Sequence, residues 1–421
     1  MPGDAVEANP PRPPFFKGGS IFHFSGLIMD IKGFRFSAVE AAIKKPGRLD
    51  LALIFSEVPA SVAAVFTTNK VQAAPVIISR ARAKNGSCRA LLVNSGNANA
   101  CTGEPGMADA LECGRRTAEA LGLPDEELLI ASTGVIGQPL PMDRFRRGIQ
   151  PVVDGLATGT LDEVANAIMT TDTFVKIERR LGEAGGRSYC LQGVAKGAGM
   201  IEPNMATMLS FLVTDAAVDP AFLYRAFGES VDGSFNAITV DGDTSTNDTA
   251  LIMANGAAGN PVIKAGTPEA DRFLVLLHDI LLSLAKKIVQ DGEGATKFVE
   301  IRVMGAASNA DAKKAALSVA NSLLVKTAFF GQDANWGRII AAVGYSGAEM
   351  EQDRVEIRFD DVVMAVNGVF AGGDAEAAGT EVLKQKEFKV TIDLRVGSGE
   401  AAVYTSDLSY DYVRINADYR T

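Results

Sequence analysis

The sequence predicts an α+β fold rather than a doubly wound α/β fold. Runs of β-branched and aliphatic residues, typical of strands, occur in both halves of the 421-residue chain. Helical stretches separate some of these runs, but strands and helices do not alternate regularly, as a doubly wound sheet requires. No repeat of fixed period is visible. We therefore expect layers that contain mixed or antiparallel sheets.

The first half of the chain contains several strand-like runs and one helical stretch. A helix is expected over residues 107–121, and Gly122 supplies a stop signal directly after it. The runs that read as strands are residues 50–58, 61–69, 74–79, 89–96, 128–137, 188–201 and 206–218.

The second half contains the clearest helix, residues 268–290. Thr267 is a suitable N-cap, Pro268 takes the first helical position, and Glu269 lies in the first turn. A shorter helix is expected near residues 219–229. The runs that read as strands are residues 298–305, 355–366, 388–397 and 401–406.

Composition excludes several classes of protein. The chain is 47% hydrophobic and 22% charged, with a net charge of −10, which is typical of a soluble protein. No Lys/Arg cluster indicates nucleic-acid binding. The most apolar helical run, residues 273–289, is interrupted by charged residues that a membrane span tolerates poorly. Residues 1–20 lack the features of a signal peptide, so we expect a cytoplasmic protein in which residues 1–31 form an unassigned, disordered extension.

Cysteine and histidine patterns do not supply the usual catalytic or metal sites. Cys88, Cys101, Cys113 and Cys190 show no C-x-x-C spacing and are expected to be buried free thiols, without a metal site. The two histidines are His23 and His278, and His278 lies within the long predicted helix, where a structural role is expected. A Ser-His-Asp or Cys-His mechanism therefore has no candidate base.

Two glycine-containing segments lack the complete cofactor or metal motifs. Residues 196–199 have neither Walker A spacing nor the dinucleotide-binding fingerprint. Residues 241–245 begin like a calcium loop but lack its later Gly and Glu, so they are interpreted as a capped turn. No bound cofactor is expected.

A threonine can also be activated by its own α-amine, if it is the first residue of a chain. Residues 196–209 read KGAGMIEPNMATML, where glycines and a Pro-Asn turn precede Ala206-Thr207 and a strand-like run. This arrangement suits an N-to-O acyl shift, in which the Thr207 hydroxyl attacks the preceding carbonyl. The chemistry alone leaves open an ordinary surface threonine at the start of a strand.

This segment resembles the processing site of the ornithine acetyltransferase family, the self-cleaving glutamate N-acetyltransferases of arginine biosynthesis. Further matches occur in order along residues 32–421. They are DLALIFSEVPASVAAVFTTN, NSGNANACTG, ASTGVIG, AIMTTDT, FNAITVDGDTSTNDT, KTAFFGQDANWGRI and YVRINADYRT. One departure is Val175 in TFVK, where the family often has proline.

The resemblance implies cleavage between Ala206 and Thr207. The α chain would contain the domain 32–206 with the oxyanion hole, and the β-chain domain 207–421 would begin with the nucleophile. The implied fold is a mixed α/β sandwich of the N-terminal-threonine nucleophile type. The implied assembly is a heterotetramer of two α and two β chains.

The resemblance also implies a ping-pong reaction. Thr207 takes the acetyl group of N2-acetylornithine, and glutamate then removes it. Thr133 and Gly134 match the oxyanion hole. Lys196 is the candidate partner of the substrate carboxylate, and Glu293 that of a substrate ammonium. Further substrate contacts match Thr173, Asn416 and Thr421, so the C-terminus should fold back over the pocket, and a C-terminal tag should reduce activity.

Other readings remain open at this level. Taken alone, Thr133-Gly134 is an ordinary strand-ending turn, and Lys196 or Glu293 a solvated surface charge. An N-terminal-nucleophile amidase or aminopeptidase would resolve the acyl-threonine with water instead of glutamate, and a non-enzymatic binding or scaffold protein would not cleave itself. The sequence leaves open whether acetyl-CoA is also a donor.

Overall fold

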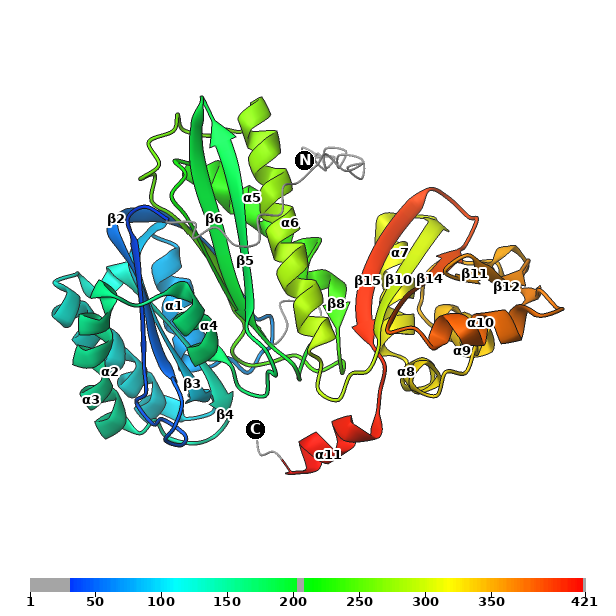
Figure 1. The fold of residues 1–421 in the computed structure, drawn as a ribbon, viewed down its shortest axis with the longest axis horizontal. Coiled ribbons are helices and arrows are strands. Elements are labelled where there is room, and N and C mark those ends of the chain that lie inside the picture. The colour runs from blue at the N-terminus through cyan, green and yellow to red at the C-terminus, as the bar shows by residue number, and fades with distance from the viewer. Residues whose placement is uncertain (1–30, 203–207, 419–421) are drawn as a thin grey trace, which may run out of the picture. The chain divides into compact units, whose positions relative to one another are not determined.

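Two mixed β-sheets organise the residues that the computed structural model describes, 31–202 and 208–418 (Figure 1). The first sheet has the order β4-β3-β2-β9-β7-β6-β5, and β1 pairs with β2. The pairs β3–β4 and β7–β9 are parallel, and the others are antiparallel. The strands are β1 Phe34–Val39, β2 Leu51–Phe66, β3 Ser87–Asn97, β4 Leu128–Val135, β5 Lys176–Ala184, β6 Arg187–Lys196, β7 Leu209–Thr214 and β9 Thr249–Ala254. The predicted mixed α/β architecture is confirmed.

Strands β7 and β9 form the buried centre of the first sheet. Every residue of both strands is buried, which explains their nearly continuous apolar sequences, LSFLVT and TALIMA. Helices α5 (Pro220–Asp232) and α6 (Pro268–Gln290) contribute to the core cluster that includes these strands, and α6 lies along β5 and β6 in Figure 1. The first sheet thus combines strands from both sides of residue 206.

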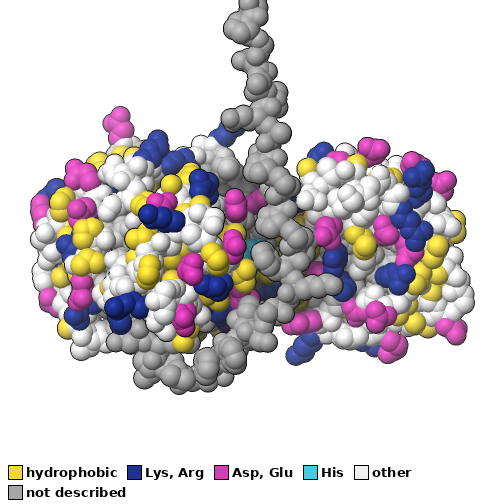
Figure 2. All heavy atoms as spheres, turned by 90° about the horizontal axis from the view of Figure 1, so that it is seen from above, with side chains coloured by type: hydrophobic (Ala, Val, Ile, Leu, Met, Phe, Trp, Pro, Cys, Tyr) yellow, Lys and Arg dark blue, Asp and Glu magenta, His cyan; other side chains and the backbone are white. Residues whose placement is uncertain are grey.

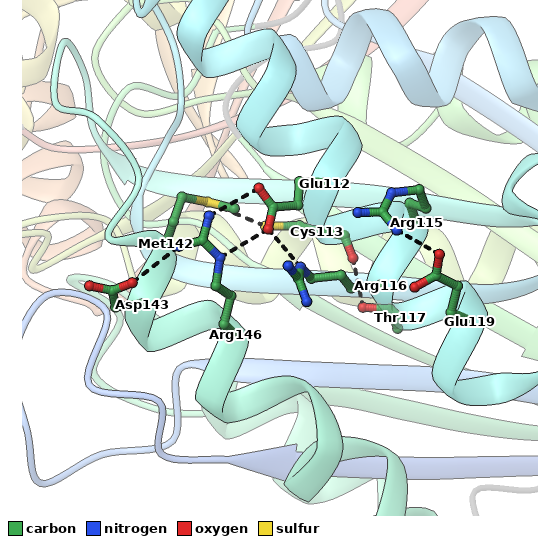
Figure 3. Close-up of polar contacts among 9 residues, drawn as sticks. All are labelled: Glu112, Cys113, Arg115, Arg116, Thr117, Glu119, Met142, Asp143 and Arg146. Carbon is green, nitrogen blue, oxygen red and sulfur yellow. Dashed lines mark hydrogen bonds and ion pairs between the residues drawn. The ribbon is translucent and has the colours of Figure 1, made fainter.

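A second core cluster of the first sheet packs with helices from the first half of the chain. It joins β2, β3 and β4 to α1, α2 and α3. The helices of this part are α1 Ala74–Ala83, α2 Gly103–Leu121, α3 Met142–Asp154 and α4 Leu161–Ile168. On the outside, Glu112 of α2 accepts hydrogen bonds from Arg116 and from Arg146 of α3, which connects the two helices (Figure 3). These bonds lower the pKa of Glu112 to about 2.

The second sheet has the order β13-β12-β11-β14-β10-β15-β8. Its strands are β8 Ile238–Thr239, β10 Phe298–Ala306, β11 Glu356–Phe359, β12 Val362–Val366, β13 Val369–Phe370, β14 Glu387–Asp393 and β15 Gly399–Ser406. The associated helices are α7 Asn309–Asn321, α8 Leu323–Phe330, α9 Trp336–Gly344 and α10 Ala375–Leu383, and α11 Tyr410–Asp418 ends the described chain. A separate core cluster of small, aliphatic and aromatic side chains supports this sheet.

Several sequence predictions can be compared with these elements. The helix at residues 268–290 is confirmed, with the Thr267 hydroxyl accepting a hydrogen bond from the Ala270 N–H at 3.2 Å. Gly122 ends α2 in the left-handed conformation, with φ of +68°. Residues 74–79 were expected as a strand, but they form α1, with Pro75 in its first turn. The expectation of buried thiols holds for Cys88, Cys113 and Cys190 but is wrong for Cys101, which is exposed.

The described surface carries both signs of charge. On the face shown in Figure 2, Lys and Arg side chains are interspersed with Asp and Glu side chains. Among the described helices, none is long and apolar enough to cross a membrane.

Candidate active site

A pocket with a cavity volume of about 220 Å³ brings together five of the residues singled out in the sequence. They are Thr133, Gly134, Lys196, Glu293 and Asn416. The remaining lining residues are Ala98, Ile136, Thr170, Thr171, Gly199, Met200, Asp241, Asp243, Ser245, Thr246, Asn247 and Tyr412. Ala206, Thr207 and Thr421 lie outside the described residues.

Thr133 and Gly134 reach the pocket from the end of β4. Gly134 has φ of +133°, and a Cβ at this position would stand 2.3 Å from the carbonyl carbon of Gly96 in β3. Only glycine permits this close approach of the two strand ends. The side-chain amide of Asn247 donates to the carbonyls of Ala98 and Ser132, at 2.6 and 2.8 Å, and so fixes the same strand ends.

Lys196, the last residue of β6, brings a buried cation into the pocket. Its side chain donates to the Thr133 hydroxyl over 3.1 Å, and the residue is 4% exposed. Burial lowers the pKa of Lys196 below its ordinary value, while the nearby carboxylate of Asp172 opposes this effect. A buried ammonium close to a hydroxyl is suited to binding a carboxylate or a developing oxyanion.

A buried ionic cluster lies behind Lys196. Lys176 forms ion pairs with Asp172, at 2.7 Å, and with Asp291, and all three side chains are at most 2% exposed. Asp172 also accepts the N–H of Gly197 at 2.8 Å. Burial acts to raise the pKa of Asp172, but the charges of Lys196 and Lys176 hold it below its ordinary value. The cluster therefore fixes the backbone directly after Lys196. Its Asp172 carboxylate also provides a negative charge close to the Lys196 ammonium.

Thr173 does not line the pocket, although the resemblance assigns it a substrate contact. Its N–H donates to both carboxylate oxygens of Asp291, at 3.1 and 3.0 Å, and its hydroxyl donates to the same group. The neighbouring Thr170 and Thr171 line the pocket instead. In this arrangement Thr173 belongs to the ionic cluster.

Glu293 and Asn416 contact each other in another part of the pocket wall. The Asn416 side-chain amide donates to the Glu293 carboxylate at 2.8 Å, and the Glu293 N–H donates to the Ala198 carbonyl at 2.9 Å. A Cβ on Gly199 would stand 2.5 Å from the Glu293 carboxyl group, so the absence of a side chain makes room for this carboxylate. Helix α11 thereby brings a C-terminal residue to the pocket.

Asp241 is a pocket residue that sequence reasoning did not assign to the site. Its carboxylate accepts the N–H groups of Met200 and Ile201, at 2.6 and 2.7 Å, and the hydroxyl of Tyr412 at 3.3 Å. It also accepts the Asp243 N–H at 3.3 Å, which agrees with the predicted capped turn. Burial raises the pKa of Asp241 to about 6. No sequence signal distinguished this aspartate from an ordinary turn residue.

The described residues include no cluster of three or more His, Cys, Asp or Glu side chains arranged to hold a metal ion. The charges that the pocket offers to a ligand are instead one buried ammonium, from Lys196, and the carboxylates of Asp241, Asp243 and Glu293. Such a pocket is suited to a small molecule that carries both an anionic and a cationic group.

Comparison with known proteins identifies the family. The model of the ArgJ family matches residues 35–421. The chain belongs to the ArgJ family. It is 69% identical over 393 residues to the arginine biosynthesis bifunctional protein ArgJ of Geobacter sulfurreducens, covering 93% of this chain and all of that protein. The ArgJ protein of Syntrophotalea carbinolica is 57% identical over 395 residues, covering 94% of this chain and all of that protein.

A solved ArgJ structure is also similar. The arginine biosynthesis bifunctional protein ArgJ of Bacillus halodurans is 43% identical, with a TM-score of 0.49, covering 51% of this chain and all of that chain. The match of the family model confirms, over residues 35–421, the family predicted from the sequence motifs.

Proposed function

We propose that this ArgJ family member moves the acetyl group of N2-acetylornithine to L-glutamate, within arginine biosynthesis. The observation that supports this substrate pair most directly is the charge arrangement of the pocket. Lys196 offers a buried cation, while Asp241, Asp243 and Glu293 offer anions. N2-acetylornithine carries a carboxylate and a side-chain ammonium, so both of its charges find a partner of opposite sign.

The proposed nucleophile is Thr207, exposed by self-cleavage after Ala206. The Thr207 hydroxyl attacks the acetyl carbonyl and passes its proton to its own α-amine, whose ordinary pKa of roughly 7.7–8.0 suits a base near neutral pH. The tetrahedral intermediate places negative charge on the former carbonyl oxygen, toward the Thr133 hydroxyl and the Gly134 N–H. The C–N bond then breaks, the amine returns the proton to the leaving nitrogen, and ornithine departs.

Glutamate completes the cycle. Its amino group attacks the acetyl-threonine ester, the ester C–O bond breaks, and the proton returns to the Thr207 oxygen. Lys196 is the proposed partner of the substrate carboxylate in both halves of the reaction. Glu293, which Asn416 holds through a 2.8 Å hydrogen bond, is the proposed partner of a substrate ammonium. Thr173 and Thr421 remain proposed substrate contacts on the basis of the family motif alone.

The proposal includes an assembly of the two products of cleavage. The α chain, residues 1–206, and the β chain, residues 207–421, would stay together because the first sheet takes strands from both. Two copies of each chain would form the heterotetramer, in the cytoplasm and without a bound cofactor. The curated relatives are named bifunctional proteins, and acetyl-CoA is the proposed second acetyl donor if this chain is also bifunctional.

Intact-mass measurement of the purified protein, with and without N2-acetylornithine, tests this function. We expect two fragments that meet at the Ala206–Thr207 bond, and an acetyl adduct on the β fragment alone. Thr207→Ala should remain one chain. An adduct on the α fragment, or no adduct under a quench that preserves esters, would contradict the mechanism.

The acceptor is tested separately by following ornithine release. An acetyltransferase should release ornithine repeatedly only when glutamate is present, and N-acetylglutamate should appear in equal amount. Acetate formation at the same rate without glutamate would favour an amidase. Replacing N2-acetylornithine with acetyl-CoA in the same assay measures the second donor activity.

A further inference from the structure

Lys196 is a buried lysine whose ammonium is only partly hydrogen-bonded within the described chain. An ammonium group has three N–H donors, and one of them is bonded to the Thr133 hydroxyl at 3.1 Å. Among residues 31–202 and 208–418, no carboxylate forms a direct ion pair with Lys196, which is 4% exposed. Because burial favours the neutral amine, the charged form that binds a carboxylate needs a negative charge nearby.

Asp172 supplies a negative charge directly behind Lys196. Its carboxylate accepts the N–H of Gly197, the residue after Lys196, at 2.8 Å, and the N–H of Thr170 at 2.9 Å. It also accepts a hydrogen bond from the Lys176 ammonium at 2.7 Å. The Asp172 side chain is 0% exposed, and Asp172 is not one of the described residues that line the pocket. It therefore acts on the pocket through Lys196 and not through contact with a ligand.

The charges of the buried cluster balance only if Lys196 is protonated. Lys176 forms ion pairs with both Asp172 and Asp291, so two carboxylates share one ammonium. A net negative charge in a buried site is unfavourable unless a further cation neutralises it. The ammonium of Lys196, next to the Gly197 N–H that Asp172 accepts, is that cation.

Other charged groups also act on Lys196. Burial lowers the pKa of Lys196, and the charge of Lys176 acts in the same direction. The carboxylates that oppose this effect are those of Asp172, Asp248 and Glu293. Burial raises the pKa of Asp248 well above its ordinary value, which favours its uncharged form, and Glu293 is the proposed partner of the substrate ammonium. Asp172 therefore remains as the carboxylate that stabilises the charge of Lys196 independently of the substrate, since the two lysines hold its pKa below the ordinary value despite burial.

We propose that Asp172 is a positioning residue, which keeps Lys196 cationic and fixed in the pocket wall so that Lys196 can bind the substrate carboxylate. This inference rests on the proposed function, in which Lys196 is the partner of that carboxylate. Asp291 assists, because it shares the charge of Lys176 and leaves part of the Asp172 charge for Lys196. Asp172 itself touches neither the substrate nor the acetyl group.

The inference gives substrate binding a pH dependence of defined sign. The value of kcat/KM for N2-acetylornithine should fall as the pH rises through the pKa of Lys196, because a neutral amine does not attract the substrate carboxylate. An opposite charge a few ångström away shifts a pKa by about 1–3 units in favour of the charged form. Asp172→Asn should therefore move this basic limb to lower pH by about 1–3 units. Asparagine keeps an oxygen that can accept the Gly197 N–H, so the substitution chiefly removes the charge.

The test compares Asp172→Asn with Asp215→Asn, using kcat/KM per cleaved chain between about pH 6 and 10. Asp215 is also a buried aspartate that accepts two backbone N–H groups, those of Cys190 and Lys32, but it does not line the described pocket. The basic limb should move down in Asp172→Asn alone. The difference between the two variants should shrink as the pH falls, because Lys196 regains its proton, whereas acid would not repair a merely structural defect.

A substrate without the carboxylate provides a second readout. N-acetylputrescine has the chain of N2-acetylornithine but lacks the carboxylate that Lys196 is proposed to bind. On the basic side of the profile, Asp172→Asn should reduce kcat/KM for N2-acetylornithine about tenfold relative to Asp215→Asn, and that for N-acetylputrescine less than about twofold. An equal loss with both substrates would contradict the inference.

The inference and the proposed function fail in different ways. A wild-type chain that is neither cleaved nor acetylated contradicts the proposed function. If the wild-type chain is cleaved and acetylated, and the basic limb of Asp172→Asn coincides with that of Asp215→Asn, the inference is overturned.

Asp172→Glu extends the test if Asp172→Asn does not fold or is not cleaved. Because glutamate keeps the charge and displaces it by one methylene, the basic limb should stay within about half a pH unit of the wild-type position. A basic limb that moves down by about one unit or more in this charge-retaining variant would also overturn the inference.

Discussion

The ammonium nitrogen of Lys196 lies 3.1 Å from the hydroxyl oxygen of Thr133. The two residues belong to β6 and β4, which are separated by four strands in the order of the first sheet. The contact therefore depends on the correct formation of the whole sheet. It also ties the candidate oxyanion donor to the candidate carboxylate partner, so a change in one should affect the other.

Thr133→Val should lower kcat by about 10²–10³-fold, because valine has the shape of threonine without the hydroxyl that the oxyanion requires. Thr133→Ser is the matched control, since it keeps the hydroxyl, and it should retain most of the activity. The measurement is single-turnover formation of the acetyl adduct. Equal rates in the valine and serine variants would remove Thr133 from the oxyanion hole.

Lys176→Met should destabilise the fold by about 3–5 kcal/mol, because it leaves the buried carboxylates of Asp172 and Asp291 without the cation between them. Lys297→Met is the control, since among the described residues the side chain of this buried lysine donates to the carbonyls of Lys384 and Gln385 and forms no ion pair. Urea unfolding of both variants measures the difference. A loss no greater than that of Lys297→Met would show that the cluster does not depend on its charge.

Gly199→Ala should reduce kcat/KM for N2-acetylornithine about tenfold to a hundredfold, because the new methyl group displaces the Glu293 carboxylate. Most of the change should be in KM, since Glu293 is proposed to bind substrate. Gly228→Ala, within α5, is the control, because a Cβ there meets nothing within 4 Å. An unchanged KM in Gly199→Ala would exclude Glu293 from substrate binding.

Asp241 predicts a pH dependence of substrate binding. Its pKa of about 6, raised by burial, means that the pocket loses one negative charge as the pH falls below 6. The KM for N2-acetylornithine should then rise, by up to about tenfold per pH unit. N2-acetylnorvaline is an acetyl donor that lacks the side-chain amine. Its KM should not rise in this way as the pH falls below 6. If KM rises equally at low pH with both donors, the titrating group is not Asp241 acting on the side-chain ammonium.

Protonation of Asp241 at low pH should weaken substrate binding, but it should stabilise the fold. A carboxyl group whose pKa is higher in the folded state than in the unfolded state favours folding most when it is protonated. Its contribution is therefore complete below pH of about 3.8, and it is lost as the pH rises through 6. Thermal unfolding between pH 4 and 7, at constant salt, would measure this trend against the other carboxylates.

Sequence patterns correctly predicted elements whose ends carry recognisable capping residues. The helix at residues 268–290 has an N-cap threonine, a first-turn proline and an apolar stripe, and these local features were sufficient. Residues 74–79 misled the prediction because a short, mostly apolar run fits a buried helix as well as a strand. Pro75, which suits a first helical turn, was the signal that favoured the helix.

The site was predictable only in part, for a physical reason. Thr133, Lys196 and Glu293 could be named through motif resemblance, and the fold brings them to one pocket. Asp172 and Asp291 were missed as separate functional candidates, because an aspartate buried by distant strands has the same local sequence pattern as one in an exposed turn. Burial and unsatisfied hydrogen bonding depend on contacts across more than 100 residues, as between Lys176 and Asp291.

The position of β7 and β9 between β2 and β6 has a consequence for how the enzyme can be made. A fragment ending at residue 206 would keep β2 and β6 but lose the strands that pair with both, leaving two long unpaired edges that invite aggregation. The proposed cleavage between Ala206 and Thr207 would therefore have to follow folding, with the uncut polypeptide serving as the template for both chains. Separately synthesised halves would have to find each other before either could close its sheet.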